Sequence, residues 1–386
     1  MMLSFRSAAG LFVGLSLLLT AQALRAAGPI FTPAAPSVAA KSFYLMDFDS
    51  GRVLAEKDAD KRVSPASLTK IMTVYVVFRE LKSGHLTLDE KVTVSQNAWE
   101  TGGSKMFIEV NKQVSVQDLL QGDIIQSGND ASVALAEHVA GSEQTFATMM
   151  NEQATRLGMV NSHFENSTGL PISNHYSSAH DLALLAQALI KEFPDYYRWF
   201  SQKEFTFNNI TQKNRNQLLW RDETVDGIKT GFTDDAGYCM VASAKRDDMR
   251  LISVVMGAAS PNARANESQS LLNYGFRFFE THRLYEAGTA LTEARVRKGE
   301  TSKLSVGVAE DVYVTAPRKH FNELKAESQV DKTIIAPVNK GDTVGSLNVA
   351  LAGETILSRP LVAMDSVPEG GFFRRLYDAV VVMLEK

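Results

Sequence analysis

The spacing of apolar residues changes along the chain and divides it into regions of different expected structure. Apolar residues at 42–48 and 52–55 flank an Asp-Ser-Gly turn, which predicts a β-hairpin. From about residue 95 to residue 200, apolar residues recur every three or four positions, as in helices. Two more strands are predicted at 237–244 and 251–257. Strands at both ends of a helical insert predict one α+β domain whose sheet wraps around that insert.

One predicted helix carries apolar residues on most of its sides. The sequence predicts that it begins at Pro65, with Ser64 as its N-cap, and ends at Gly84. A helix that is apolar all round is usually buried, so we expect it at the centre of the domain. Another helix is predicted from Asn266 to about Thr281, after the last strand.

Beyond residue 284 the pattern changes to short runs in which every second residue is apolar. Such runs are typical of strands, and turns with glycine separate them. They predict a small all-β domain over residues 284–367, after a larger domain over residues 28–283. The runs lie at 304–308, 312–314, 344–351 and 356–362.

The last segment, residues 368–386, is predicted to hold an amphipathic helix. Phe372, Leu376 and Val380 share one face, whereas two arginines and an aspartate lie opposite. About 15 residues are too few to cross a bilayer as a helix, but they can lie along a membrane surface. We therefore expect this helix to bind a membrane surface. The alternative is a terminal helix that packs on its own β domain.

The first segment, residues 1–27, contains an arginine, an apolar run and then small residues. This order is typical of a secretory signal peptide. The alternative is a membrane anchor, but the apolar run is shorter than the roughly 20 residues that a span needs. We expect the mature chain to begin near Ala27.

Composition and charge exclude several classes of protein. The chain has 386 residues, a formal net charge of −4 and a pI near 6.0. Because it has no surplus of basic residues for a phosphate backbone, we expect no nucleic-acid partner. The single cysteine, Cys239, excludes an internal disulfide and is expected to be a buried thiol in an apolar strand. The histidines show no metal-binding spacing, so we expect no metal and no other cofactor.

The first candidate motif is Ser67-Leu-Thr-Lys70, which occurs once in the chain. Residues three apart on a helix project from the same face, so the hydroxyl and the amine lie together. A serine near the start of a helix has a base within reach, and the helix N–H groups favour a developing negative charge. This motif predicts a nucleophilic serine.

Two further motifs, 127–129 (Ser-Gly-Asn) and 229–231 (Lys-Thr-Gly), lie on elements that suit a site. The first follows an apolar helical segment, in a loop that can direct polar side chains into a cleft. The second lies on a short strand, where Gly231 would let a substrate backbone approach closely if the strand is at the sheet edge. Other copies of these triplets are expected to cap helices or turn the chain. They begin at Lys82, Ser95, Ser260 and Ser346.

Together and in this order, the three motifs are those of penicillin-interacting serine enzymes. From about Ser37 to the C-terminus, the chain resembles the low-molecular-mass penicillin-binding proteins, which are D-alanyl-D-alanine carboxypeptidases. The resemblance implies an antiparallel sheet with a helical insert, as in serine β-lactamases and transpeptidases. It also implies stem peptides ending in D-Ala-D-Ala as substrate and β-lactam antibiotics as covalent inhibitors. Further segments that carry it are 103–107, 126–131, 169–171, 175–179, 226–231 and 235–238.

The resemblance assigns roles to the catalytic residues. Ser67 would attack the penultimate D-Ala carbonyl and form an acyl-enzyme, and Lys70 would take its proton. Burial and the nearby charge of Lys229 would lower the pKa of Lys70, because a lysine with a pKa of about 10.4 is rarely neutral. Ser127 would relay a proton to the leaving D-Ala amine, and Asn129 would hold the substrate amide.

The remaining site residues bind the substrate according to the same resemblance. Lys229 and Thr230 would bind the terminal carboxylate beside Gly231, and the backbone N–H groups of Ser67 and Phe232 would form the oxyanion hole. Some family members carry histidine where this chain has Phe232. Two arginines are weaker candidates: Arg264, near the carboxylate pocket, and Arg215, beside the cleft. For both, the alternative is a solvated surface side chain.

The resemblance implies a periplasmic carboxypeptidase that is attached peripherally to the outer face of the cytoplasmic membrane. It would remove the terminal D-Ala from peptidoglycan pentapeptides. The alternatives are a D,D-endopeptidase, a β-lactamase and a non-catalytic peptidoglycan-binding protein. A class A β-lactamase needs a glutamate and an asparagine to position a water, and the pair Glu165-Asn166 lacks the required separation. Because all three motifs are intact, the sequence argues against a non-catalytic binding protein.

Overall fold

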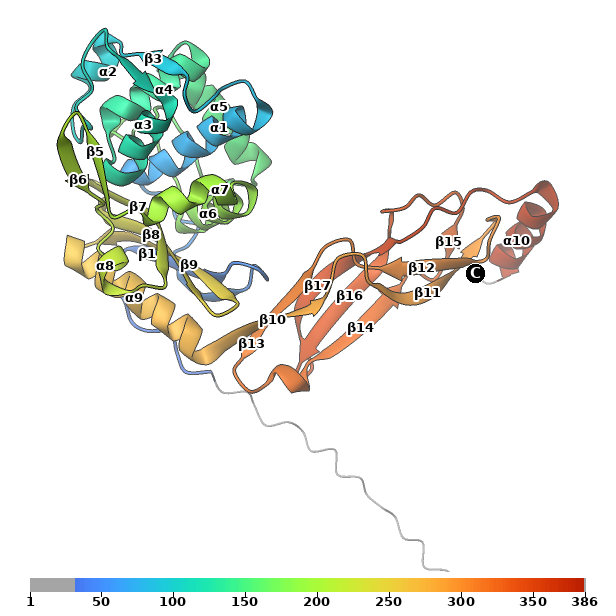
Figure 1. Cartoon of the computed structure of the whole chain (residues 1–386). Helices are drawn as coiled ribbons and strands as arrows, with labels where there is room; N and C mark the ends of the chain where they lie inside the picture. Colours follow the sequence, from blue (N-terminus) through green and yellow to red (C-terminus); the bar gives the residue numbers. More distant parts are fainter. Residues whose placement is uncertain (1–31, 385–386) are drawn as a thin grey trace, which may run out of the picture. The chain divides into compact units, whose positions relative to one another are not determined.

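The larger region of the protein is built on a five-stranded sheet in which all neighbouring strands are antiparallel (Figure 1). The computed structural model describes residues 32–384, so the expected signal peptide, 1–27, lies outside the described residues. The strand order is β2-β1-β9-β8-β7, which places β7 at one edge. The strands are β1 (Ser42–Asp47), β2 (Val53–Lys57), β7 (Val225–Thr233), β8 (Gly237–Arg246) and β9 (Met249–Ala258).

Helices cover both faces of this sheet. α9 (Pro261–Phe278) packs on β8 and β9, and α6 (Ala179–Glu192) packs on β1 and β9 (Figure 1). Along β1, Leu45 enters the core beneath α9, whereas Tyr44 and Met46 enter the core beneath the other helices. Successive side chains of a strand point to opposite faces, so both faces of β1 are apolar. The predicted α+β fold with a helical insert is confirmed.

The insert between β2 and β7 also contains two small two-stranded sheets, β3-β4 and β5-β6. Its helices are α1 (Lys70–Ser83), α2 (Gln96–Glu100), α3 (Val116–Gln121), α4 (Asn129–Ala140), α5 (Glu143–Arg156), α6, α7 (Pro194–Tyr197) and α8 (Leu218–Arg221), with the shorter η1 (Ala66–Thr69), η2 (Gly122–Gln126) and η3 (Arg198–Ser201). Its strands are β3 (Lys91–Thr93), β4 (Gln113–Ser115), β5 (Glu204–Phe207) and β6 (Ile210–Lys213).

The buried central helix ends as predicted but begins differently. The 3-10 helix η1 precedes α1, and its N-cap is Pro65, so Ser64 is not the cap that the sequence predicts. Ala66 has a φ of +48°, a left-handed conformation that is rare for alanine and turns the chain sharply just before Ser67. A local turn of this kind leaves no signal in the apolar spacing. α1 ends at Gly84, whose φ of +77° is that of a helix C-cap.

The helix after the last strand begins earlier than the predicted Asn266. Ser260 caps α9 and accepts a hydrogen bond from the Ala263 N–H, and a proline occupies the first position. The prediction missed this start because the first turn is polar, so the apolar spacing begins only after it. β10 (Phe279–Tyr285) follows α9 directly and crosses the expected domain boundary at residue 284.

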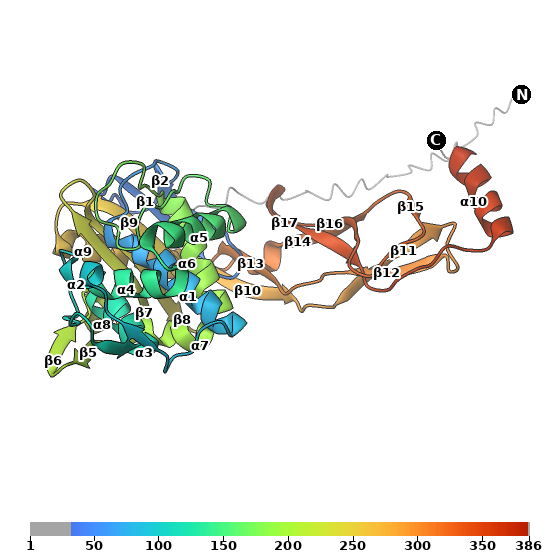
Figure 2. The same ribbon diagram turned by 90° about the horizontal axis from the view of Figure 1, so that it is seen from above.

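The second region is all-β, as predicted, and has its own apolar core (Figure 2). β10 pairs with β13, and six strands form a sheet of order β14-β16-β17-β12-β11-β15. Ser346, expected at a cap or turn, lies within β16 instead, because the alternating apolar neighbours continue the strand through it. The remaining elements are β11 (Ala290–Arg297), β12 (Lys303–Gly307), β13 (Val312–Pro317), η4 (Phe321–Glu323), β14 (Lys325–Val330), β15 (Ile334–Ile335), β16 (Thr343–Leu351) and β17 (Glu354–Ala363).

Buried polar side chains link the two regions. The Asp47 carboxylate accepts hydrogen bonds from the hydroxyls of Ser50 and Thr281, both at 2.7 Å. The Thr315 hydroxyl lies 2.6 Å from that of Ser50 and 2.8 Å from that of Thr281. Every polar group in this cluster has a partner, so it can be buried without a large desolvation penalty.

The terminal helix α10 (Phe372–Leu384) contacts the β region through its polar side. Asp378 is buried, and its carboxylate accepts a hydrogen bond of 2.5 Å from the Lys298 N–H. Phe372, Phe373 and Leu376 are exposed. Within residues 32–384, no helix is both long and apolar enough to cross a membrane.

Candidate active site

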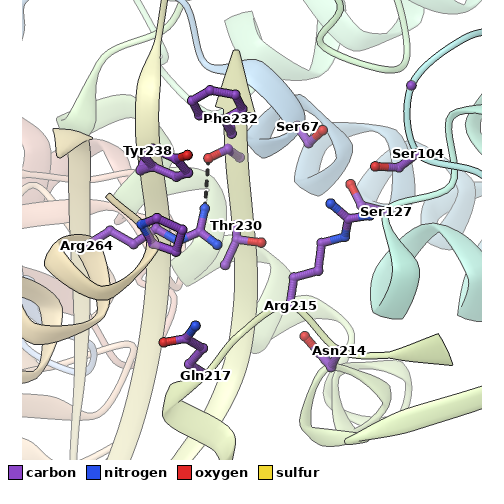
Figure 3. A pocket seen from close by; sticks show the side chains of 13 residues that line it. Ser67, Ser104, Ser127, Asn214, Arg215, Gln217, Thr230, Phe232, Tyr238 and Arg264 are labelled. Carbon is purple, nitrogen blue, oxygen red and sulfur yellow. Dashed lines mark hydrogen bonds between the residues drawn. The ribbon is translucent and has the colours of Figure 1, made fainter. Parts of the chain in front are cut away.

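A cavity of about 620 Å³ separates the helical insert from the edge strand β7 (Figure 3). Figure 3 shows Ser67 and Ser127 on the helical side and Thr230 and Phe232 on β7. Seven of the ten predicted site residues line this cavity, and the other three lie buried behind it. The lining residues are Ser67, Gly103, Ser104, Ser127, Asn214, Arg215, Gln217, Thr230, Gly231, Phe232, Tyr238, Pro261 and Arg264.

The expected nucleophile and base lie together. Lys70 Nζ is 3.3 Å from Ser67 Oγ and donates to Asn129 Oδ1 at 2.7 Å and to the Thr168 carbonyl at 2.6 Å. These contacts fix the amine beside the serine. The side chain of Lys70 is almost completely buried, at 1% exposure.

Burial lowers the pKa of Lys70 to about 8. Arg215 lowers it further, whereas Asp123, Asp130 and Glu143 raise it. The expectation that burial lowers the pKa of Lys70 is therefore confirmed. Repulsion between the two lysines instead affects the pKa of Lys229. Burial lowers that pKa well below its usual value, and the charge of Lys70 lowers it further.

The turn at Ala66 depends on a close approach by a distant glycine. Gly169 has a φ of +79°, and a Cβ placed on it would come within 1.9 Å of the Ala66 carbonyl oxygen. No side chain fits there, so only glycine allows this packing. The sequence analysis used Gly169 only as part of the resemblance and did not assign it this role.

Ser127 follows the π-helix η2 and has a φ of +66°, an unfavourable conformation of the kind found at functional sites. Its buried hydroxyl has no hydrogen-bond partner within the described residues, and it faces the cavity. Asn129 connects the base to the loop opposite, because its Nδ2 donates to the Gly102 carbonyl at 2.7 Å.

Asp130 holds that loop in place, a role that the sequence analysis missed. Its carboxylate accepts hydrogen bonds from the backbone N–H groups of Met106, Phe107 and Ile108, at 2.9 to 3.3 Å. The signal available in the sequence was an aspartate in the first turn of a predicted helix. In the structure, the Asp130 side chain is completely buried. Hydrogen bonds to a charged group are stronger than neutral ones, so this contact orders the wall of the cavity.

The third motif lies on β7, which is an edge strand of the sheet. Gly231 is packed against the chain that carries the nucleophile, since an added Cβ would lie 3.1 Å from both the Pro65 carbonyl and the Ser67 nitrogen. The close approach that this glycine allows is therefore with η1. Lys229 is buried, and its Nζ donates to the Thr230 carbonyl at 3.2 Å.

Both arginines line the cavity, but in different ways. Arg264 is buried, and its Nη1 donates to the Gly231 carbonyl at 3.0 Å, so it also supports β7 (Figure 3). Arg215 is exposed, and its guanidinium points toward Ser127 (Figure 3). The ring of Phe232 stacks on Tyr238 with centroids 4.3 Å apart.

The structure keeps several other candidates out of the cavity. Cys239 is buried in β8, and burial raises the pKa of its thiol to about 11. Glu165 pairs with His163 at 3.4 Å, and Asn166 Oδ1 accepts from the Gly169 N–H at 2.7 Å. These contacts hold the pair within its own loop, which disfavours the β-lactamase alternative. Within residues 32–384, no cluster of His, Cys, Asp or Glu could hold a metal ion.

Two cavity residues gave no sequence signal, and a third, Ser104, stands only within the segment 103–107 that carries the resemblance. Asn214, Gln217 and Ser104 come from loops and carry ordinary polar side chains, and only the fold brings them to the cleft. The backbone of Asn129 donates to the Ser104 carbonyl at 2.7 Å, which ties two walls of the cavity together.

Comparison with known proteins places the chain among proteins with this architecture. The profile of the D-alanyl-D-alanine carboxypeptidase family matches residues 30–260, and that of the penicillin-binding protein 5 C-terminal domain matches 279–369. The chain is 48% identical over 359 residues to D-alanyl-D-alanine carboxypeptidase DacC of Escherichia coli, covering 91% of this chain and 90% of that protein. It is 43% identical over 357 residues to DacA of Haemophilus influenzae, covering 91% of each. The crystal structure of penicillin binding protein 5 from Haemophilus influenzae superimposes with a TM-score of 0.84 at 43% identity, covering 87% of this chain and 100% of that chain.

Proposed function

The chain belongs to the D-alanyl-D-alanine carboxypeptidase family, and we propose that its cavity carries out this family's reaction with Ser67 as the nucleophile. The protein is a serine-type D-Ala-D-Ala carboxypeptidase. The observation that supports the assignment of residues is the buried amine of Lys70, 3.3 Å from the Ser67 hydroxyl. A neutral amine at this distance can take the serine proton.

In the acylation step, Ser67 Oγ bonds to the carbonyl carbon of the penultimate D-Ala, and its proton moves to the lone pair of Lys70 Nζ. The carbonyl oxygen becomes an oxyanion, which the backbone N–H groups of Ser67 and Phe232 stabilise. Ser127 then gives its hydroxyl proton to the nitrogen of the terminal D-Ala as the C–N bond breaks, and the proton held by Lys70 replaces it, which leaves the amine neutral. Water hydrolyses the ester and releases the shortened peptide.

Recognition of the terminal carboxylate falls to β7 and to Arg215 from the loop before α8. Thr230 and Arg215 line the cavity, and Lys229 is buried next to Thr230 on β7. A substrate carboxylate at this position would favour the charged form of Lys229, against the effect of burial. Asn129 Oδ1 accepts a hydrogen bond from Lys70 Nζ. The side chain of Asn129 therefore orients the base as well as the substrate amide.

The direct test is intact mass spectrometry after mixing the protein with benzylpenicillin. We expect a lasting adduct on the wild type and none on Ser67→Ala. Ser83→Ala, at the far end of the same helical segment, is the matched control and should react like the wild type. Release of D-Ala from a pentapeptide should follow the same pattern. A wild type that forms no adduct, or an adduct on Ser67→Ala, would contradict the assignment.

We also infer that the protein works outside the cytoplasm, on a membrane surface. The support is the signal-peptide pattern of residues 1–27, the substrate in the cell wall, and the exposed face of α10. Phe373 is 84% exposed and Phe372 is 66% exposed, while Asp378 turns the polar side to the protein. Exposed aromatic side chains on one helix face are typical of an interfacial anchor. This location is the periplasm, on the outer face of the cytoplasmic membrane.

Sedimentation with vesicles that contain anionic lipid tests this inference. Deleting residues 369–386 should leave the protein in the supernatant, and replacing Phe372 and Phe373 with serine should weaken binding. Ile172→Ser is the matched control, because that side chain is exposed in the larger region. Equal binding of the full chain and the deletion variant would contradict the anchor.

A further inference from the structure

A buried carboxyl group lies beside the catalytic lysines but outside the three motifs. Asp123 is on the π-helix η2, four residues before Ser127, and its side chain has no exposed surface. Burial of a carboxylate is unfavourable unless charges or hydrogen bonds compensate. Its Oδ2 has no hydrogen-bond partner within the described residues. Compensation must therefore come largely from charges.

The charges that face Asp123 are those of the site. They are Lys70, Lys229 and Asp130. Lys70 is the charge with the largest effect on Asp123, and Asp123 is the charge with the largest effect on Lys70. Burial raises the pKa of Asp123 to about 6, and Lys70 opposes that rise. The carboxyl group is therefore ionised above about pH 6.

The other carboxylates that face Lys70 are already engaged. Both oxygens of Asp130 accept hydrogen bonds from backbone N–H groups of the 106–108 loop. Glu143 accepts from the backbone N–H and the hydroxyl of Ser167, at 2.9 and 2.6 Å. The remaining charge that faces Lys70 is Arg215, which is positive. Asp123 differs from both carboxylates, because within the described residues its own carboxylate accepts no hydrogen bond from a backbone N–H and its one partner is the Ser132 hydroxyl.

The hydroxyl of Ser132 lets Asp123 hold its charge in place. Ser132 Oγ contacts both Asp123 Oδ1 and the Gly128 carbonyl, but it has one hydrogen to donate. When Asp123 is ionised, that hydrogen goes to the carboxylate, and the Gly128 carbonyl keeps its hydrogen bond from the Ser132 N–H at 3.1 Å. When Asp123 is protonated, the acid donates to Ser132, which donates to Gly128. The hydrogen bond between Asp123 and Ser132 is therefore kept in both states without movement of heavy atoms.

We propose that Asp123 is a positioning residue whose buried negative charge stabilises the proton on Lys70 once Ser67 has lost it. The inference rests on the proposed role of Lys70 as the base. The covalent step is unchanged: the Ser67 O–H bond breaks, the Oγ–C bond forms, and the proton moves to Lys70 Nζ. Asp123 takes no proton and touches no substrate. It makes Lys70 a stronger base, because a carboxylate in a water-excluded site favours the ammonium form.

The test is the pH profile of acylation. The second-order rate constant for a chromogenic cephalosporin is measured between pH 5 and 10 on the full-length wild type, Asp123→Asn and Asp123→Leu. Asparagine keeps a hydrogen bond to Ser132 without the charge, and leucine removes the buried polar group altogether. Ser132→Ala is a graded variant, because it removes the hydrogen bond that favours the charged form of Asp123 and keeps the carboxyl group. Circular dichroism melting identifies any variant that does not fold.

In the wild type, the rate should fall below about pH 8, as Lys70 becomes protonated. Loss of the Asp123 charge should lower the midpoint of this pH profile by about one unit. At pH 6, a shift of that size makes the neutral fraction of the Lys70 amine about tenfold larger. The plateau at high pH should drop severalfold, because the base is weaker. Ser132→Ala should move the midpoint in the same direction by a smaller amount, because it weakens the charge on Asp123 without removing it.

A midpoint that stays in place in both Asp123 variants would overturn the inference, even if their rates fall at every pH, because that result indicates a structural role only. If one Asp123 variant fails to fold, the other decides. A wild type that is not acylated at any pH would instead refute the proposed function, so the two failures are distinguishable.

Discussion

The two regions of the protein use their interiors for different purposes. The larger region buries Lys70, Asp123 and Lys229 together, beside its apolar core. The β region buries a core of aliphatic side chains such as Leu304 and Leu361. Its buried charges, Arg297 and Asp378, lie outside that core. Buried charges are costly, so their concentration at one place in the larger region marks that place as the site of chemistry.

The largest effect should come from removing a buried charge of the site. Lys70→Met retains the length and apolar stem of the side chain but removes the base. We expect the rate of acylation by benzylpenicillin to fall by a factor of about 10² to 10⁴, the usual contribution of a general base. Stopped-flow or timed mass spectrometry measures the rate. A fall of less than fivefold would mean that another group takes the proton.

A change in the β-region core should have the opposite signature. Leu304 is 1% exposed, and Leu304→Ala leaves a cavity that should lower the free energy of unfolding by about 2 to 5 kcal/mol. Acylation per folded molecule should stay within twofold of the wild type. Urea unfolding measures the stability, and active-site titration with penicillin normalises the rate. A large loss of rate in the folded fraction would show that the two interiors are coupled.

The pH dependence sharpens the comparison without a mutation. Burial lowers the pKa of Lys70 to about 8, so the neutral amine is the main form above that pH and becomes scarce below it. The acylation rate should therefore fall about tenfold for each pH unit below 8. Unfolding of the β region should show no transition of this kind. A rate that is constant from pH 6 to 9 would contradict the assignment of Lys70.

The smallest effect should come from a buried titratable group outside the site. Burial raises the pKa of Cys239 to about 11, so the thiolate is scarce at neutral pH. Cys239→Ala should leave the acylation rate within twofold, and the native protein should resist an aromatic disulfide reagent until it is unfolded. Rapid labelling of the native protein would show that this thiol is more accessible than its position in β8 indicates.

The apolar pattern was enough to predict the central helix and the strands of the sheet. Each of these elements buries a regular series of side chains, so its spacing is visible in the sequence. The start of α9 was missed because its first turn is polar, although Ser260 and Pro261 were available as signals. The turn at Ala66 and the packing of Gly169 against it depend on residues about a hundred positions apart.

The site was predictable where short motifs carry the chemistry and unpredictable where single polar residues support it. Ser67, Ser127 and Thr230 could be placed by their motifs, and the structure brings all three to one cavity. Asp123 and Asp130 could not be recognised, because an aspartate on a predicted helix is usually solvated. Only the fold shows that both are completely buried beside the base.

The edge position of β7 also has a consequence for how the protein behaves in concentrated solution. Among the described strands, β7 is the last of its sheet on the side of the cavity. An open strand edge can pair with the edge of another copy, which is a common start of aggregation. The protein covers this edge itself, because Gly231 packs against η1 and the Gly227 carbonyl accepts a hydrogen bond of 2.9 Å from the Asn216 side chain. Concentrated solutions should therefore remain clear on storage, with and without a bound β-lactam.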